Sequence, residues 1–164
     1  ILYNIVDSDH SLGIVLHNRR TIMILETAFM CMALNIYHEA KFQSMLGQIA
    51  VGQVVMNRVE DSRFPDNVCD VVTQAVTYKG TDKPVLHKCQ FSWYCNGESD
   101  EPKYDSEEWW NAQEYASIVL SGTIALDVTE GATHYHATYV RPAWAKTKTK
   151  TTRIDRHIFY RWEK

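Results

Sequence analysis

Glu39 is the residue whose position most clearly allows chemistry. Apolar side chains recur every three or four positions through residues 21–40, which predicts a helix with one buried stripe. The stripe consists of Leu25, Phe29, Met32 and Ile36. The next step along it is Glu39, at the C-terminal end of the helix, where burial and the helix dipole both raise a carboxyl pKa. Such a group can stay protonated and donate a proton to a glycosidic oxygen, whereas a Glu just past the last turn would simply be solvated.

Three histidines near the C-terminus offer a second possible chemistry. His134 and His136 alternate on a predicted strand, so they point to one side, and His157 is placed on the neighbouring strand. The pattern resembles the zinc sites of cell wall amidases and peptidases. Candidates for the further ligands are His10, His17, His38 and Asp127. These follow no recognisable spacing, so we expect the histidines to form hydrogen bonds within the sheet or line a cleft, with no metal or cofactor.

A short aromatic segment could contact a sugar. Gln90, Phe91, Ser92 and Trp93 place an amide, a hydroxyl and two rings in four consecutive positions. Saccharides offer hydroxyls at their edges and C–H faces for stacking, so this composition suits them. Aromatic residues make up 12% of the chain, which fits either an aromatic-lined cleft or an aromatic-rich core.

Two further helices are expected to position these residues. One runs from Ser44, a plausible N-cap, to Arg58. Its inward face consists of Leu46, Ile49, Ala50 and Val54. Gly47 and Gly52 lie within it and indicate close approach by another helix or a ligand, so the adjacent Gln48 becomes a candidate for substrate binding.

A second helix spans residues 106–121, with Asp105 and Glu108 as a capping box and Gly122 at its end.

The remaining segments read as a shorter helix, a loop and strands. The shorter helix is expected over residues 68–75, and residues 77–104 are expected to form a loop. Residues 131–136 and 156–162 have strand-like content, and the Lys/Thr run over 146–152 is expected to connect them. The predicted fold is α+β, mainly helical with a small antiparallel sheet.

Length and charge limit the class of protein. The 164 residues suit one domain over 21–164, with residues 1–20 as an extension packed on it, and we expect a monomer. Residues 141–164 hold eight Lys and Arg against two acidic residues, while the rest of the chain is acidic. Apolar residues interleave with the basic ones, which favours a folded terminal strand over nucleic-acid binding.

No run reaches the ~20 apolar residues of a membrane span. The chain begins at Ile1 rather than Met, which is compatible with removal of a leader, anchor or tag.

The cysteines indicate at most one cross-link. Cys31 lies in an apolar helical run and is interpreted as a buried thiol. Cys69, Cys89 and Cys95 could supply one disulfide, and their spacing does not select the pair. No nucleophile signature, phosphate-binding loop or dinucleotide fingerprint is present.

Several segments, in order, resemble the SleB/CwlJ-type cell wall hydrolases, a family of spore cortex-lytic enzymes and phage-borne relatives within the lysozyme-like superfamily. They are Ile36–Ala40, Gly47–Val51, Val54–Val59, Phe64-Pro65, Val68–Val72, Gln90–Trp93, Gly131–His136, Trp144 and His157–Tyr160. The resemblance covers residues 25–162. It implies a lysozyme-like fold and cleavage of the MurNAc-β-1,4-GlcNAc bond of peptidoglycan glycan strands at the bacterial cell wall, by a periplasmic, extracellular or phage-encoded enzyme.

The resemblance also assigns the site residues. The catalytic Glu falls on Glu39, and the substrate cleft falls on residues 90–93, on Thr133, His134, Tyr135 and His136, and on Trp144. The family commonly reads E-A-R-G-E where this chain has Glu39-Ala40-Lys41-Phe42-Gln43, so a second carboxylate is lost. We therefore expect a lytic transglycosylase with Glu39 as sole acid and base. The alternatives are a hydrolytic muramidase that uses Asp66, Asp70, Glu98 or Asp100, a zinc amidase or peptidase, and a non-catalytic wall-binding module.

Overall fold

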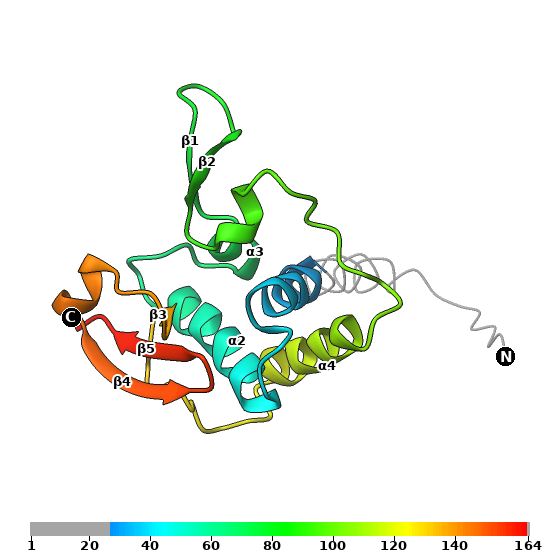
Figure 1. The fold of residues 1–164 in the computed structure, drawn as a ribbon, viewed down its shortest axis with the longest axis vertical. Helices are drawn as coiled ribbons and strands as arrows, with labels where there is room; N and C mark the ends of the chain where they lie inside the picture. The colour runs from blue at the N-terminus through cyan, green and yellow to red at the C-terminus, as the bar shows by residue number, and fades with distance from the viewer. Residues whose placement is uncertain (1–26, 164) are drawn as a thin grey trace, which may run out of the picture.

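The computed structural model describes residues 27–163, so the extension expected over residues 1–20 lies outside the described residues. Within this range a helix over 27–40, α2 (Met45–Glu60), α3 (Val68–Val72) and α4 (Glu107–Ser121) form the body of the molecule. A three-stranded sheet lies at one side, and a two-stranded hairpin projects from the body (Figure 1). None of the helices in residues 27–163 combines the length and apolarity needed to cross a membrane.

The helices begin and end where side chains satisfy their free backbone groups. The Ser44 hydroxyl accepts from Gly47 N at 3.2 Å, which confirms Ser44 as the N-cap of α2. The cap of α4 is Ser106, whose hydroxyl accepts from Trp109 N, so the prediction of Asp105 was wrong by one residue. Gly122 ends α4 with φ of 65°, a left-handed conformation that favours glycine.

Two buried clusters hold these elements together. The larger lies between the helices and includes Met32, Ile36, Val55, Val71, Val72, Trp93 and Trp109. The smaller lies between α2 and the three-stranded sheet and includes Ala50, Val54, Ala132, Ile154 and Phe159. Tyr135 packs against both clusters, so this residue joins the helical body to the sheet. A Cβ on Gly52 would meet Val119 of α4 at 3.0 Å, which confirms the expected close approach of another helix.

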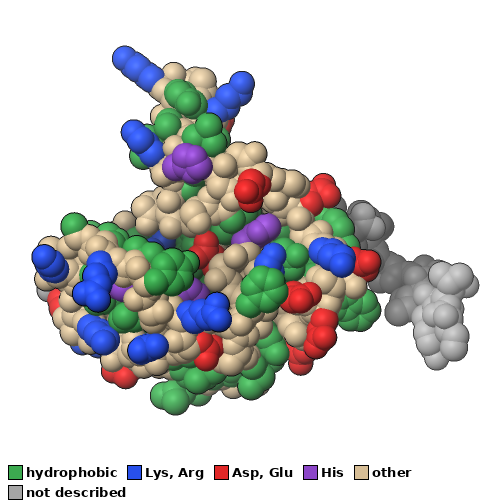
Figure 2. All heavy atoms as spheres, viewed as in Figure 1, with side chains coloured by type: hydrophobic (Ala, Val, Ile, Leu, Met, Phe, Trp, Pro, Cys, Tyr) green, Lys and Arg blue, Asp and Glu red, His purple; other side chains and the backbone are tan. Residues whose placement is uncertain are grey.

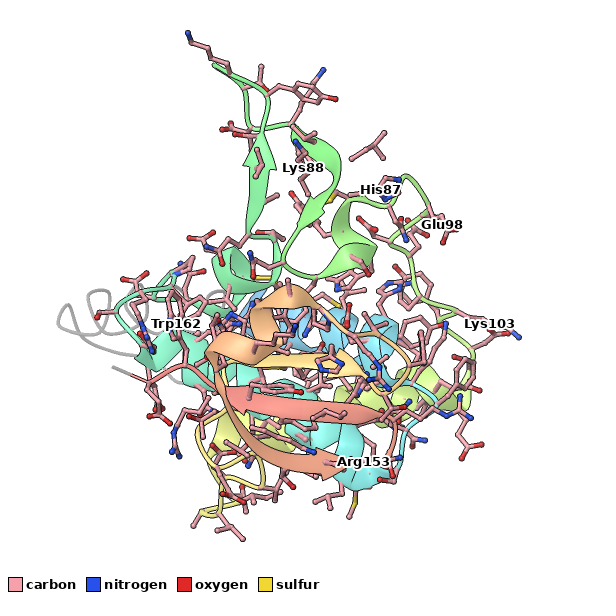
Figure 3. All side chains as sticks on the ribbon, turned by 60° about the vertical axis from the view of Figure 1, so that its left-hand side comes forward. His87, Lys88, Glu98, Lys103, Arg153 and Trp162 are labelled. Atoms are coloured by element: carbon pink, nitrogen blue, oxygen red, sulfur yellow. A yellow bond between two sulfur atoms is a disulfide. The ribbon has the colours of Figure 1, made fainter. Side chains whose placement is uncertain are left out.

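The segment predicted as a loop over 77–104 contains regular structure. β1 (Ala75–Thr77) and β2 (Pro84–Cys89) form the projecting hairpin, and the 3-10 helix η1 (Ser92–Cys95) follows. In Figure 3 the labelled His87 and Lys88 lie on this hairpin, beyond the body of the molecule. The hairpin was missed because β2 exposes three consecutive side chains and therefore lacks the alternation of a half-buried strand.

The three-stranded sheet contains one strand that the sequence did not predict. β3 (His134–Ala137) and β5 (His157–Arg161) pair antiparallel, as expected. The 3-10 helix η2 (Ala143–Thr147) leads into β4 (Thr149–Ile154), which pairs with the other side of β5 and gives the order β3-β5-β4. The Lys/Thr run is thus largely an edge strand rather than a connection, and its lysines and threonines suit an edge that faces water.

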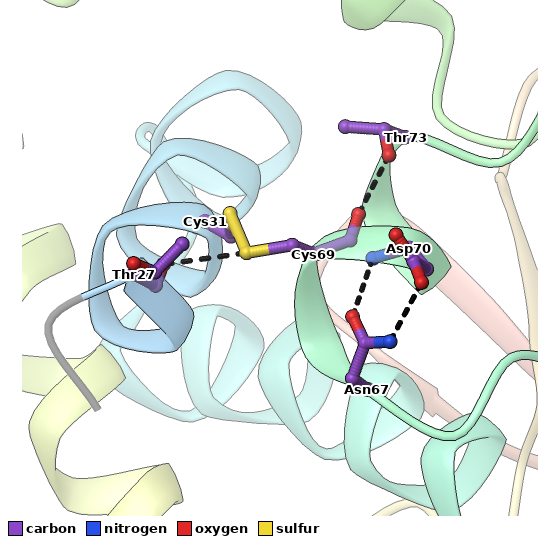
Figure 4. Close-up of a disulfide and its surroundings, with 6 residues drawn as sticks. All are labelled: Thr27, Cys31, Asn67, Cys69, Asp70 and Thr73. Atoms are coloured by element: carbon purple, nitrogen blue, oxygen red, sulfur yellow. Dashed lines mark hydrogen bonds between the residues drawn. A yellow bond between two sulfur atoms is a disulfide. The ribbon is translucent and has the colours of Figure 1, made fainter. Parts of the chain in front are cut away.

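Both pairs of cysteines are cross-linked. Cys31 of the first helix is bonded to Cys69 of α3, and Cys89 of β2 is bonded to Cys95 of η1. The interpretation of Cys31 as a free buried thiol was therefore wrong, because the packing of two helices brings its Cα to 5.3 Å from that of Cys69. Figure 4 shows this bridge beside the start of α3, where the Asn67 side chain accepts from Asp70 N at 2.9 Å.

Candidate active site

Glu39 lies in the last turn of the first helix, which ends at residue 40. The apolar stripe that predicted this helix carries the carboxyl group toward the sheet, where it remains partly exposed. Its Oε2 accepts a hydrogen bond of 2.8 Å from the hydroxyl of Tyr135 on β3. The carboxyl group is therefore held where the helical body meets the sheet.

Burial raises the pKa of Glu39 above the ordinary value for a glutamate. The hydrogen bond from Tyr135 and the positive charge of Arg58 lower the pKa, but they do not cancel the effect of burial. Glu39 thus stays protonated at a higher pH than an exposed glutamate. A proton donor with this property can act as a general acid at a pH where an exposed glutamate is already ionised.

Arg58 places a buried positive charge beside this carboxyl group. Its Nε donates to the Thr133 carbonyl at 2.7 Å, and its guanidinium lies over the rings of Phe64 and Phe91, 5.1 and 5.0 Å from their centroids. Burial lowers the pKa of Arg58 to about 10, which leaves the side chain charged at neutral pH. Its Nη1 is buried without a hydrogen-bond partner in the part of the chain that the structure describes.

Tyr135 is fixed by packing on its other sides. Its ring centroid lies 4.9 Å from that of His157 and 5.6 Å from that of Phe159, both on β5. Burial and the neighbouring Glu39 raise the pKa of Tyr135, so its hydroxyl keeps its proton and remains a donor. The sequence pattern identified Tyr135 only through the family resemblance and did not indicate that it meets Glu39.

The predicted sugar-binding segment divides between core and surface. Phe91 and Trp93 are buried; Trp93 Nε1 donates to Asn35 Oδ1 at 2.9 Å, and its ring stacks on His38 at 4.9 Å. Gln90 and Ser92 are exposed. The two rings therefore anchor the segment, and the amide and hydroxyl are the groups that can reach a ligand in solvent.

Gln48 and Gln43 lie at the start of α2. Gln48 is buried and its Nε2 donates to the Gln43 carbonyl at 3.2 Å, while its Oε1 has no partner among the described residues. Gln43, where the family pattern has a second Glu, accepts from Arg156 N at 3.2 Å. The Gln43 side chain thus ties the loop after the first helix to the turn between β4 and β5.

Three of the remaining predicted residues, His134, His136 and Trp144, lie on the opposite face of the sheet from Tyr135. Alternation along β3 points His134 and His136 outward, where their rings lie 5.2 and 5.7 Å from that of Trp144. Burial, together with nearby cationic side chains, lowers the pKa of His134 to about 3, so its ring is neutral at physiological pH. Thr133 is buried, and its hydroxyl lies 2.9 Å from His134 Nδ1.

The three histidines of the zinc hypothesis do not share a face. His157 packs against Tyr135 on the inner face, at 4.9 Å between ring centroids, whereas His134 and His136 point outward. Over residues 27–163, no three His, Cys, Asp or Glu side chains form a group that could hold a metal ion. The geometry of these donors therefore gives the zinc alternative no support.

Comparison with known proteins identifies relatives of most of the described region. A family model described as cell wall hydrolase matches residues 42–160, a range that begins just after Glu39. A curated spore cortex-lytic enzyme from Halalkalibacterium halodurans is 26% identical over 130 residues, which cover 78% of this chain and 33% of that protein. The chain thus spans about one third of the length of this relative.

Two solved structures share the fold. The catalytic domain of the Bacillus cereus SleB protein matches with a TM-score of 0.59 at 24% identity, over 83% of this chain and 91% of that one. The catalytic domain of the germination-specific lytic transglycosylase SleB from Bacillus anthracis matches with a TM-score of 0.58 at 24% identity, over 82% and 93%. These similarities confirm the predicted α+β lysozyme-like fold.

Proposed function

Because the chain belongs to the cell wall hydrolase family, a family of cell wall lytic enzymes, we propose that it cleaves bacterial peptidoglycan with Glu39 as catalytic acid. The observation that carries this proposal is the environment of the Glu39 carboxyl group. Burial raises its pKa, and a hydrogen bond of 2.8 Å from the Tyr135 hydroxyl to Oε2 holds it in place. A protonated and oriented carboxyl group can donate its proton to the glycosidic oxygen as that oxygen leaves.

The proposed bond is the β-1,4 linkage between MurNAc and GlcNAc. Glu39 donates its proton to the glycosidic oxygen as the bond from MurNAc C1 to that oxygen breaks. The Glu39 carboxylate then takes the proton from the MurNAc C6 hydroxyl, whose oxygen bonds to C1 and closes a 1,6-anhydro ring. The enzyme is thereby returned to its protonated form, and no water is consumed.

One carboxyl group is enough for this lytic transglycosylase reaction, since the substrate supplies the nucleophile. Within residues 27–163, the side chains that act on the pKa of Glu39 are Tyr135 and Arg58, and neither is a carboxylate. Gln43 occupies the position of the second family Glu and is engaged with the Arg156 backbone. Between the two steps, Glu39 is negatively charged, and the Tyr135 hydroxyl and the Arg58 cation stabilise that charge.

The proposed place of action is the cell wall, in the periplasm or outside the cell. The two disulfides support a compartment that is not reducing, because such bonds persist mainly in oxidising surroundings. A phage-borne source remains a prediction from the family resemblance.

The test compares wild type with Glu39→Gln on purified peptidoglycan. We expect the variant to lose at least about a hundredfold in rate, the usual contribution of a general acid, with 1,6-anhydro-MurNAc ends in the wild-type products by mass spectrometry. Glu114→Gln, the same change at an exposed position of α4, serves as the matched control. Products with reducing-end MurNAc would contradict transglycosylation and favour a hydrolytic muramidase.

A further inference from the structure

A cavity of about 520 Å³ opens on the outer face of the three-stranded sheet, on the side away from Tyr135. It lies between β5 and the segment that follows β3. Its lining includes His136, Arg141, Ala143, Lys146, Ile158 and Tyr160. At its base, His136 Nε2 lies 3.0 Å from the Tyr160 hydroxyl, and the two rings stack at 5.2 Å. The base is therefore a fixed surface rather than a set of mobile side chains.

The cavity has two uncommitted cations and no carboxylate in its lining. Arg141 and Lys146 are exposed, and neither forms an ion pair with an acidic side chain of residues 27–163. A second cavity of about 510 Å³ differs in this respect, because its arginines are paired: Arg63 with Asp61, and Arg161 with Glu163. Two unpaired cations beside hydrogen-bonding groups suit a carboxylate ligand.

The surrounding surface has the same sign of charge. Figure 2 shows Lys and Arg side chains gathered over the lobe that holds the three-stranded sheet, while Asp and Glu side chains are more frequent on the helical side. This agrees with the eight basic and two acidic residues of 141–164. The field near the cavity therefore attracts an anionic ligand.

We propose that this cavity binds the carboxylate-bearing peptide stems of peptidoglycan while the glycan strand lies at Glu39. The proposal rests on the proposed function, since the stem is attached to the MurNAc sugar that would be cleaved. β3 is the edge strand of the sheet, and its adjacent residues Tyr135 and His136 point to its two faces. A stem need pass only this one strand, and four or five extended residues reach about 13–18 Å.

The test uses the double variant Arg141→Gln/Lys146→Gln on two forms of one substrate, intact peptidoglycan and glycan strands whose stems an amidase has removed. We expect about a tenfold lower kcat/KM on intact material and less than a twofold change on stripped strands, as for loss of charged contacts. The matched control is Lys83→Gln/Lys88→Gln, which removes the same charge from two exposed positions of the hairpin, of which Lys88 is labelled in Figure 3.

Each outcome decides the proposal. An equal loss on both substrates, no loss on either, or the same loss in the hairpin control would overturn it. So would a loss that disappears when wall phosphate polymers, rather than stems, are removed. Binding without cleavage is measured by co-sedimentation of the inactive Glu39→Gln variant with each of the two substrates. The same measurement is made on Glu39→Gln that also carries the Arg141→Gln and Lys146→Gln substitutions. If wild type cleaves neither substrate while the stem-dependent binding persists, the glycosidase function has failed and the stem site stands.

Discussion

The hydroxyl of Tyr135 donates a hydrogen bond of 2.8 Å to Oε2 of Glu39, across 96 positions of the sequence. This contact joins the end of the first helix to the edge strand of the sheet. It favours the carboxylate, whereas burial favours the protonated acid. Burial is the larger effect, so the pKa of Glu39 is raised, while the Tyr135 hydroxyl still stabilises the carboxylate that the second step of the cycle needs.

Tyr135→Phe removes the donor and leaves the ring. The pKa of Glu39 should rise further, so the fall in rate at alkaline pH should move to higher pH. The rate itself should drop about tenfold or more, because a hydrogen bond to a charged group contributes about 1.5–3 kcal/mol. The measurement is kcat/KM on peptidoglycan as a function of pH, with Tyr115→Phe on α4 as control. An unshifted alkaline limb would show that this hydroxyl does not act on the acid.

Glu39→Gln should also change how stability depends on pH. A carboxyl group with a raised pKa in the folded state costs stability as pH rises from its unfolded pKa through its folded pKa. The Tm of the variant relative to wild type should therefore increase as pH rises above about 4, the unfolded pKa of a glutamate, and level off once pH passes the raised folded pKa. Thermal denaturation across this range measures the difference. A constant difference would mean that Glu39 titrates normally.

The helices were predictable because their buried apolar side chains recur at helical spacing and their capping residues lie next to the helix ends in the sequence. The stripe from Leu25 to Ile36 predicted a helix over 21–40 and placed Glu39 near its end, and Ser44 was recognisable as the N-cap of α2. β4 was missed for the opposite reason: a Lys/Thr edge strand needs little apolar alternation, since only one of its neighbours is a strand.

The site was predictable only in part, because its contacts are long-range. Glu39 followed from the stripe, but its partners come from α2 and β3 and share no spacing with it. Arg58 looked like the polar end of a helix, and nothing local indicated that Phe64 and Phe91 would enclose its guanidinium. The Cys31–Cys69 bridge was hidden likewise, since two helices must first pack before the sulfurs meet.

The two disulfides should contribute unequally to stability. They close segments of 38 and 6 residues, which correspond to about 4 and about 2 kcal/mol in a chain-entropy estimate. Cys31→Ala/Cys69→Ala should therefore lower the free energy of unfolding more than Cys89→Ala/Cys95→Ala. Urea denaturation of both variants, alongside wild type with and without reductant, measures these losses. The reverse order would indicate that the hairpin, rather than the packing of the first helix on α3, limits stability.

Gly47→Ala should destabilise the junction between α2 and the sheet. An added Cβ would lie 2.5 Å from Asp155 Oδ2, which accepts from Ser44 N at 2.8 Å and from the Ser44 hydroxyl at 2.6 Å. We expect a loss of about 1–3 kcal/mol, typical of overpacking. Chemical denaturation of Gly47→Ala, Asp155→Ala and the double variant tests the cause. The losses should be less than additive; strict additivity would mean that the two positions do not collide.

The alternation of β3 also limits how this part of the chain can change. On one face of the sheet Tyr135 donates a hydrogen bond to Glu39, while on the other face His134 and His136 pack against Trp144. Inserting or deleting one residue within the strand would exchange the two sets and disable both faces at once. We therefore expect relatives to accept substitutions along this strand but to keep its length, and to place their insertions in the segment between β3 and η2.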